Sequence, residues 1–158
     1  EDLEIKAKKN NLSKIEVYIL ASIVQKESSK EIEKSKIAAV YLNRIKRNMK
    51  LQADPTVIYA IKKESNNFKK IIKRVLYKDL KIKSIYNTYY YNGLPPSPIC
   101  MPDVSTIKAV LNPENHTYLY FVVDPQNPGF HLFSKDLVQH NKNKRKYTNW
   151  LNKKKIFR

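Results

Sequence analysis

The sequence predicts an α+β fold in which helices pack around a small antiparallel β-sheet within a single domain. Apolar residues recur at helical spacing over the N-terminal third of the chain. Aromatic and β-branched residues gather in two short runs, 118–123 and 130–133, separated by the turn-forming stretch DPQNPG. A length of 158 residues suits one domain with its own hydrophobic core, and neither repeats nor a long linker divide it.

The first long helix is expected over 14–28. Ser13 and Glu16 have the S-x-x-E spacing of a capping box, which marks the start of a helix. The stretch ILASIVQKESS contains Glu27, which falls four residues after Ile23 and therefore shares its apolar face. Because burying an unpaired carboxylate is costly, Glu27 either lies at the rim of this face or is placed there for chemistry.

Two further helices follow in the first half of the chain. One is expected over 33–48, and the next begins at Asp54, which can serve as N-cap because Pro55 fits the first helical position. Residues 62–83 are lysine-rich with interspersed apolar side chains, and we expect a peripheral helical segment there. Residues 1–12 are interpreted as the lead-in from a missing upstream region of a longer protein.

The second half of the chain changes in composition. Residues 85–103 are rich in aromatic residues and proline, which indicates an extended, rigid surface segment. A short helix is expected over 104–111. The two strand-like runs should then pair as a hairpin, and a last helix should begin near Asp136.

Charge and composition limit the function classes. The chain has 31 Lys and Arg against 14 Asp and Glu, a net charge of +17. Such a surface favours a polyanionic partner such as nucleic acid, anionic lipid or an acidic wall polymer, although many lysines are equally explained as solvated surface. A single cysteine, Cys100, and three histidines without metal-ligand spacing predict no metal site, and we expect no cofactor. No apolar run reaches the roughly 18 residues of a membrane span.

Five motifs, in the same order, resemble the catalytic domain of the YceG-like (MltG) endolytic murein transglycosylases. They are ASIVQKES, LQADPTVIYA, YNTY followed by GLPPSPI, YLYFVVD, and HLF followed by HN, over roughly residues 19–147. The resemblance implies a glycan-binding cleft and an enzyme that cuts the MurNAc-GlcNAc β-1,4 bond, leaving 1,6-anhydroMurNAc ends. It also implies an upstream membrane anchor, a place on the periplasmic face of the bacterial inner membrane, and penicillin-binding proteins as partners, with no nucleic acid.

The first motif points to Glu27 as the catalytic residue. The family usually has two glutamates there in an E-K-E pattern, but this chain has Gln25 in place of the first. Two helical positions are about 200° apart, so the two side chains could not face one pocket. Burial against Leu20, Ile23 and Val24 would disfavour the charged form of Glu27 and raise its pKa, as a proton donor at neutral pH requires.

The resemblance implies that one carboxyl is enough. The same glutamate protonates the leaving oxygen and then, as a base, takes the proton from the sugar's own C6 hydroxyl, which closes the anhydro ring. Ordinary glycosidases use two carboxylates, and Asp54 is a weak second candidate because helix capping already explains it. Two alternatives stay open: a hydrolase on the same fold, and a non-catalytic basic module that binds peptidoglycan or nucleic acid.

Substrate contacts are assigned to residues that match the family motifs, each with a structural alternative. Tyrosines can pack the edge of the core, and histidines can be satisfied structural residues. We expect His131, His140 or Tyr86 to form a hydrogen bond with Glu27. The candidates are Gln52, Asp54, Tyr86, Asn87, Thr88, Tyr89, His131, His140 and Asn141.

Overall fold

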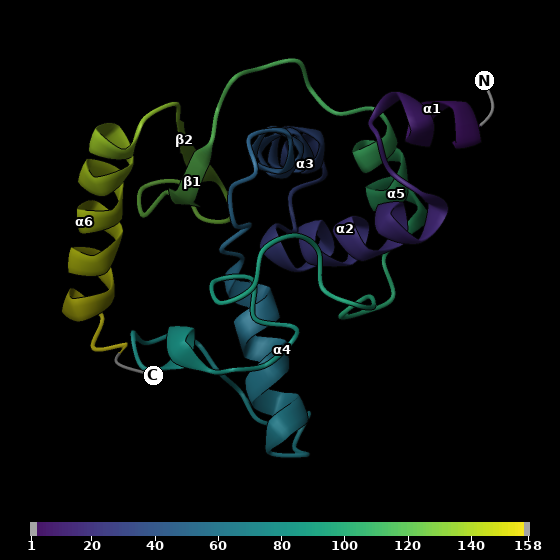
Figure 1. The fold of residues 1–158 in the computed structure, drawn as a ribbon. Helices are drawn as coiled ribbons and strands as arrows, with labels where there is room; N and C mark the ends of the chain where they lie inside the picture. Colours follow the sequence, from purple (N-terminus) through teal and green to yellow (C-terminus); the bar gives the residue numbers. More distant parts are fainter. Residues whose placement is uncertain (1–2, 157–158) are drawn as a thin grey trace.

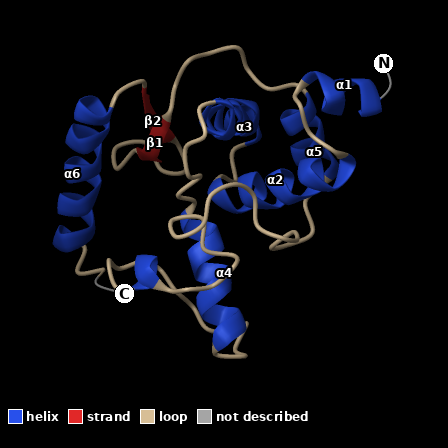
Figure 2. Ribbon diagram, viewed as in Figure 1, coloured by secondary structure: helices blue, strands red, loops and turns tan. Residues whose placement is uncertain are grey.

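The structure, a computed structural model, describes residues 3–156 (Figure 1). It combines helices with a two-stranded antiparallel sheet, as the sequence predicts (Figure 2). In chain order the elements are α1 (Leu3–Lys9), α2 (Lys14–Glu27), α3 (Glu31–Lys46), α4 (Asp54–Glu64), the 3-10 helix η1 (Asp79–Lys81), α5 (Val104–Leu111), β1 (Tyr120–Val123), β2 (His131–Ser134) and α6 (Leu137–Lys153).

The helices α2, α3 and α5 form the centre of the core. The predicted capping box starts α2: the Ser13 hydroxyl accepts from the Glu16 amide, and the Glu16 carboxylate accepts from the Ser13 amide at 2.7 Å. Seven of the fourteen residues of α2 are buried, so burial of apolar surface holds it in place. The helix ends at Glu27, which therefore sits where the core meets the surface.

The hairpin and α6 form a second layer on one side of this core. β1 and β2 pair in the register Tyr120↔Ser134 to Val123↔His131. α6 begins with Asp136 as its N-cap, as predicted, and the Asp136 carboxylate accepts from the Gln139 amide at 2.9 Å. Figure 1 shows the hairpin lying between α6 and α3. α6 packs on the two strands alone among the described elements.

Residues 62–83 do not form the expected helical segment. Only the end of α4, at Glu64, and the three residues of η1 are helical, and turns and extended backbone connect them. Of the apolar side chains that suggested a helix, Phe68 and Ile71 are exposed, and Ile72, Val75 and Leu76 are half-buried. Phe68 packs on Tyr59 with ring centroids 5.8 Å apart, but so little apolar burial does not stabilise a helix there. The side chains of this segment are mostly exposed, and Arg74 in its middle bonds the C-terminal end of α6.

Two other segments complete the fold. Residues 1–12 contain the short helix α1, whose Ala7 is buried in the core. The segment 85–103 is non-helical as predicted, but it is not confined to the surface, because Tyr86, Asn87 and Thr88 are buried. Within residues 3–156 no helix is both long and apolar enough to cross a bilayer.

Candidate active site

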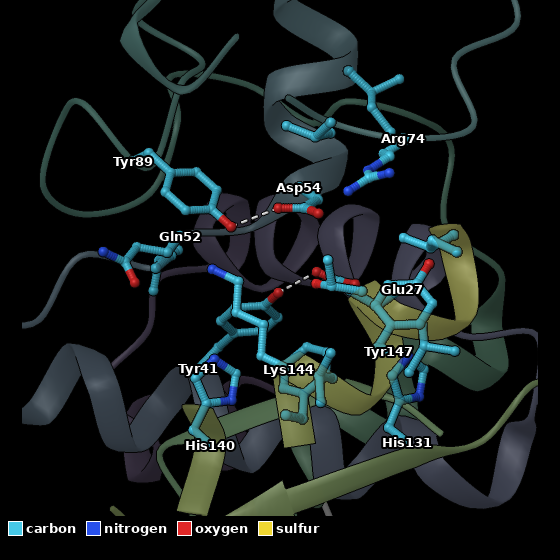
Figure 3. A pocket seen from close by; sticks show the side chains of 18 of the residues that line it. Glu27, Tyr41, Gln52, Asp54, Arg74, Tyr89, His131, His140, Lys144 and Tyr147 are labelled. Carbon is cyan, nitrogen blue, oxygen red and sulfur yellow. Dashed lines mark hydrogen bonds between the residues drawn. The ribbon is translucent and has the colours of Figure 1, made fainter. Parts of the chain in front are cut away.

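A pocket of about 300 Å³ opens between the helical core and the layer formed by the hairpin and α6. Its lining comes from the end of α2, from α3 and α4, from the 65–83 connection, from the hairpin and from α6. Figure 3 shows two carboxyl groups, those of Glu27 and Asp54, directed into this space. Sugars bind in concave sites of this kind, where a few polar groups converge within apolar walls.

Glu27 has the protonation behaviour of a general acid. Burial raises the pKa of this carboxyl to about 8; the hydrogen bond from Tyr41 acts in the opposite direction, and the nearby charge of Asp54 adds to the rise. The Tyr41 hydroxyl donates to Oε1 of Glu27. At neutral pH the carboxyl is therefore mainly protonated, and Oε2 has no hydrogen-bond partner among residues 3–156. This oxygen can present a proton to a ligand in the pocket.

Tyr41 takes the role expected of a histidine or Tyr86. It lies on α3, is only 2% exposed, and packs edge-on against Phe121 of β1 with ring centroids 5.7 Å apart. Burial, followed by the proximity of Glu27, raises the pKa of the Tyr41 hydroxyl well above its usual value, so it remains a donor. Spacing along the sequence assigns Tyr41 only to the buried side of the helix expected over 33–48. A buried tyrosine hydroxyl needs a hydrogen-bond partner, and this requirement is the feature of the sequence that points to Tyr41 as a donor.

Asp54 does not cap α4. The N-cap is Ala53, and Asp54 is the first helical residue, with its carboxylate turned toward Tyr89. The Tyr89 hydroxyl donates to Oδ1 of Asp54 at 2.5 Å, a contact drawn in Figure 3. Burial raises the pKa of Asp54, while the hydrogen bond from Tyr89 and the charge of Lys144 lower it. The pocket therefore holds a second carboxyl that the expected cap would have turned away.

The two histidines line the pocket but do not contact Glu27. His131 Nδ1 pairs with Oε2 of Glu33 at 2.8 Å, and the His131 amide donates to the other oxygen of the same carboxylate. His140 stacks on Tyr120 with ring centroids 4.9 Å apart. Burial lowers the pKa of His140, so its imidazole is neutral at physiological pH. The expected hydrogen bond from a histidine to Glu27 is wrong.

Gln52 and Tyr89 are the other predicted residues that line the pocket. Gln52 adopts a left-handed backbone conformation, with φ of 51°. Its amide donates to the Thr88 carbonyl at 3.1 Å, which joins the turn before α4 to the YNTY motif. The side chain is exposed and so remains available to a ligand.

Four predicted residues lie outside the pocket lining. Tyr86 packs on Tyr59, and its hydroxyl shares a hydrogen bond of 2.7 Å with Ser97. Asn141 is exposed on α6, beside His140. Neither therefore faces the pocket.

Asn87 and Thr88 instead hold the backbone behind the pocket. The fully buried Asn87 amide donates to two carbonyls of the chain just before it, at 3.0 and 2.8 Å. The Thr88 hydroxyl accepts from the Ala53 amide at 2.9 Å and bonds the Thr56 hydroxyl at 2.8 Å. The bonds of Thr88 fix the start of α4 and with it the position of Asp54.

Gln25 lies away from the pocket, as its helical position predicts. Its side chain bonds Asp103 and Thr106 at the start of α5, so it serves to join α2 to α5. Across residues 3–156, no three His, Cys, Asp or Glu side chains are arranged to hold a metal ion.

Comparison with known proteins gives a consistent set of relatives. The model of the YceG-like family matches residues 1–146. An endolytic murein transglycosylase of Bacillus subtilis (strain 168) is 41% identical over 154 residues, which cover 98% of this chain and 40% of that protein. Another of Streptococcus pneumoniae serotype 2 (strain D39) is 35% identical over 117 residues, covering 74% of this chain and 21% of that protein.

A solved structure agrees with these relatives. The crystal structure of a YceG-like protein from Listeria monocytogenes matches with a TM-score of 0.74 and 37% sequence identity. The match covers 88% of this chain and 42% of that one. The chain therefore spans less than half the length of each of these proteins.

Proposed function

Because the chain belongs to the YceG-like family, we propose that it is an endolytic murein transglycosylase with Glu27 as its catalytic residue. The observation that carries the proposal is the Glu27 carboxyl: it faces a pocket and has a pKa raised to about 8. A carboxyl that is protonated at neutral pH and reaches a concave surface can donate a proton to a bound glycan. The names of the two transglycosylase relatives support peptidoglycan as that glycan.

The proposed reaction cuts the β-1,4 bond between MurNAc and GlcNAc in two proton transfers. Glu27 gives its proton to the glycosidic oxygen as the bond from that oxygen to C1 of MurNAc breaks, and GlcNAc leaves with a free 4-hydroxyl. The Glu27 carboxylate then takes the proton of the C6 hydroxyl as O6 bonds to C1. The product carries a 1,6-anhydroMurNAc end, and Glu27 is protonated again. No water and no protein nucleophile take part.

Neighbouring residues support these steps. The hydroxyl of Tyr41 donates to Glu27 and so stabilises the carboxylate that forms when the proton leaves. The carboxyl of Asp54 lies close enough to influence Glu27, and its ionised form would stabilise positive charge developing on the sugar ring.

Hydrolysis is the second candidate function, and the position of Asp54 favours it. Glycosidases that use water pair an acid with a second carboxylate, and Asp54 turns into the pocket rather than capping α4. In that case Asp54 would act on water or on C1, and the product would carry a reducing end. The two candidates share Glu27 as the acid and differ in the chemistry of the new end.

Digestion of purified peptidoglycan tests both candidates. We expect wild type to release fragments with anhydro ends, identified by mass spectrometry as lighter than reducing ends by one water. Glu27→Gln should keep the fold, judged by circular dichroism, and lose the release of fragments. Reducing ends in place of anhydro ends would establish hydrolysis instead. Full activity of Glu27→Gln would contradict both assignments.

The setting of the reaction is also a proposal. We infer that the protein works on nascent strands at the periplasmic face of the inner membrane, beside penicillin-binding proteins, since strand cutting there trims or terminates new glycan. A basic module that only binds polymer is the remaining alternative, supported by the net charge of +17. A titration with DNA at increasing salt tests it, because binding to nucleic acid weakens steeply as salt rises.

A further inference from the structure

Four cationic side chains line the pocket that holds Glu27, and three of them are left for a ligand once Arg44, whose guanidinium donates to backbone carbonyls, is set aside. Lys73 and Arg74 come from the connection between α4 and η1, and Lys144 comes from α6. We call these three residues the cationic cluster. In Figure 3, Arg74 enters the pocket beside Asp54, and Lys144 enters it from α6.

The cationic cluster has no acidic partner within residues 3–156. None of its members forms an ion pair there, and the ion pairs of the described chain lie elsewhere. Lys144 lowers the pKa of Asp54 through its charge, but the two groups are not in contact. The protonation of Glu27 is governed by burial, Tyr41 and Asp54, so the cationic cluster is not what sets it.

Arg74 is held in a fixed position by the end of α6. Its Nη1 donates to Oδ1 of Asn152 at 3.0 Å and to the Ile156 carbonyl at 3.1 Å. The remaining guanidinium nitrogens, Nε and Nη2, have no partner in the described part of the chain. These two N–H groups form one edge of the planar fork that binds a carboxylate with two parallel hydrogen bonds.

Position separates the cationic cluster from the many other cations of this chain. Most of the 31 lysines and arginines need no explanation beyond solvated surface. Arg74 is half-buried at the pocket, where its field is stronger and less screened by salt than on an open surface, whereas Lys73 and Lys144 line the pocket with exposed side chains. Charges left unpaired beside a reactive carboxyl are therefore available to a ligand that brings the opposite charge.

We propose that the cationic cluster binds a carboxylate on the C3 substituent of a MurNAc residue, so that the enzyme selects anionic glycan strands over neutral ones. This inference rests on the proposed function, since it takes peptidoglycan as the ligand. Two sources share the chemistry: the free carboxylate of the lactyl ether in strands without peptides, and the carboxylates of an attached stem peptide. Both extend from the same sugar position.

Binding to the Glu27→Gln variant tests the proposal without cleavage. Three strand preparations of equal length are compared by calorimetry: strands stripped of peptide, the same strands with lactyl carboxylates converted to methylamides, and strands with intact stem peptides. We expect at least one carboxylate-bearing preparation to bind about tenfold or more tightly than the methylamide strands. The stripped and peptide-bearing arms identify which source supplies the carboxylate. Equal affinity for all three preparations overturns the proposal.

Charge-removing variants, each made in the Glu27→Gln background, locate the effect. Arg74→Gln and Lys144→Gln should each weaken binding of the preferred anionic strands several-fold and leave binding of the methylamide strands unchanged. Lys144→Gln keeps the bonds from Arg74 to α6 and removes the charge of Lys144 together with its contact over the Tyr77 ring, 5.7 Å from the centroid. Lys108→Gln, on the exposed side of α5, is the matched control and should change neither affinity. Unchanged affinity in both Arg74→Gln and Lys144→Gln would contradict the assignment.

The two proposals can fail separately. If wild type cleaves anionic and methylamide strands with equal kcat/KM, the proposed function stands and the anion site is overturned. If the Glu27→Gln variant prefers anionic strands but wild type releases no fragments, the anion site stands and the catalytic proposal fails.

Discussion

Two opposing effects act on the pKa of the Glu27 carboxyl. Burial favours its neutral form, while the hydroxyl of Tyr41 stabilises the charged form. An acid that must give up a proton and recover it needs both forms within reach, and a pKa of about 8 provides this near neutral pH. The two helices that carry these groups, α2 and α3, are core elements, so the pair is held rigidly.

The pH dependence of cleavage should follow the protonation of Glu27. The first step uses the protonated carboxyl, so activity should be high below a pH of about 8 and fall as pH rises through that value. Initial rates of fragment release across this range, with binding measured separately, check the expectation. An alkaline limit more than two pH units away from 8 would show that another group governs the reaction.

Tyr41→Phe should move this alkaline limit upward. A hydrogen bond to a charged group is worth about 1.5–3 kcal/mol, so its loss should raise the pKa of Glu27 by about one to two units. The carboxylate formed on proton donation is then less stable, and kcat should fall by about tenfold or more. Tyr59→Phe, at a residue that packs on Tyr86 outside the pocket, is the matched control and should alter neither quantity. A lower kcat without a shifted pH profile would contradict this role of Tyr41.

Glu27→Gln should also stabilise the protein at alkaline pH. With its pKa raised from 4.5 to about 8, the folded state holds a proton that the unfolded state has lost between these values. Wild-type stability therefore falls as pH rises through this window, by up to a few kcal/mol. Urea unfolding at pH 5 and pH 9 should show the variant gaining stability relative to wild type only at the higher pH. Glu64→Gln, exposed at the end of α4, should behave like wild type at both.

Sequence motifs predicted the role of an individual residue only where the position of that residue in its own helix decides the direction of its side chain. Glu27 was predicted because its helical face and motif agree, and the structure places it in the pocket. Tyr41 was not, since its role depends on how α3 packs against α2, a contact that spacing along the chain does not encode. Asp54 was assigned to a cap because Asp before Pro fits that role locally, whereas the Tyr89 hydroxyl holds it in the pocket.

At the scale of elements, Arg44 joins α3 to both sides of the site. Its side chain is buried, and it donates to the Leu119 carbonyl at 2.6 Å and to the Lys50 carbonyl at 2.9 Å. Arg44 thus fixes both the residue directly before β1 and the turn before α4. Arg44 pairs with no acidic group in these contacts. Its contribution to stability therefore comes from the backbone carbonyls to which it donates hydrogen bonds.

Arg44→Leu should therefore destabilise the fold strongly. Removing the guanidinium leaves buried carbonyls unpaired, at a cost of about 2–4 kcal/mol in the free energy of unfolding. Arg47→Leu removes the same charge from an exposed position at the end of α3 and should change stability by less than about 0.5 kcal/mol. Chemical denaturation of the two variants gives the comparison. Equal losses would mean that charge, rather than these bonds, explains the effect.

Elements were predictable to the extent that their own pattern specified them. The capping box, the α5 run and the paired aromatic strands carry local signals, and each forms close to where it was expected. Residues 62–83 carry the apolar side chains that suggested a helix, but these are exposed or half-buried, so little tertiary packing supports that helix. Their contribution to the pocket, through Lys73 and Arg74, depends on contact with α6 and left no signal in the sequence.

At the scale of the whole molecule, the pocket lies between a densely buried layer and a sparsely buried one. α2 buries seven residues, whereas α6 buries only Asn143 and Leu151 among its described residues. α6 contacts the two strands, and its C-terminal end is held in addition by Arg74. A layer with little buried apolar surface opens at lower free energy than the core. One side of the pocket is thus fixed, and we expect the other to adjust when a ligand binds.

Hydrogen exchange should reveal this asymmetry. Amides in the C-terminal half of α6 should exchange through local opening, at least about tenfold faster than those of α2, which open only on global unfolding. Binding of glycan strands to Glu27→Gln should slow exchange in α6 and in residues 66–78, because residues of both segments line the pocket, and leave α2 unchanged. Arg74→Gln should speed exchange in α6 without ligand, because its bonds to Asn152 and Ile156 are lost. If α6 and α2 exchange together at a single rate, the two layers unfold as one unit and the pocket has no mobile side.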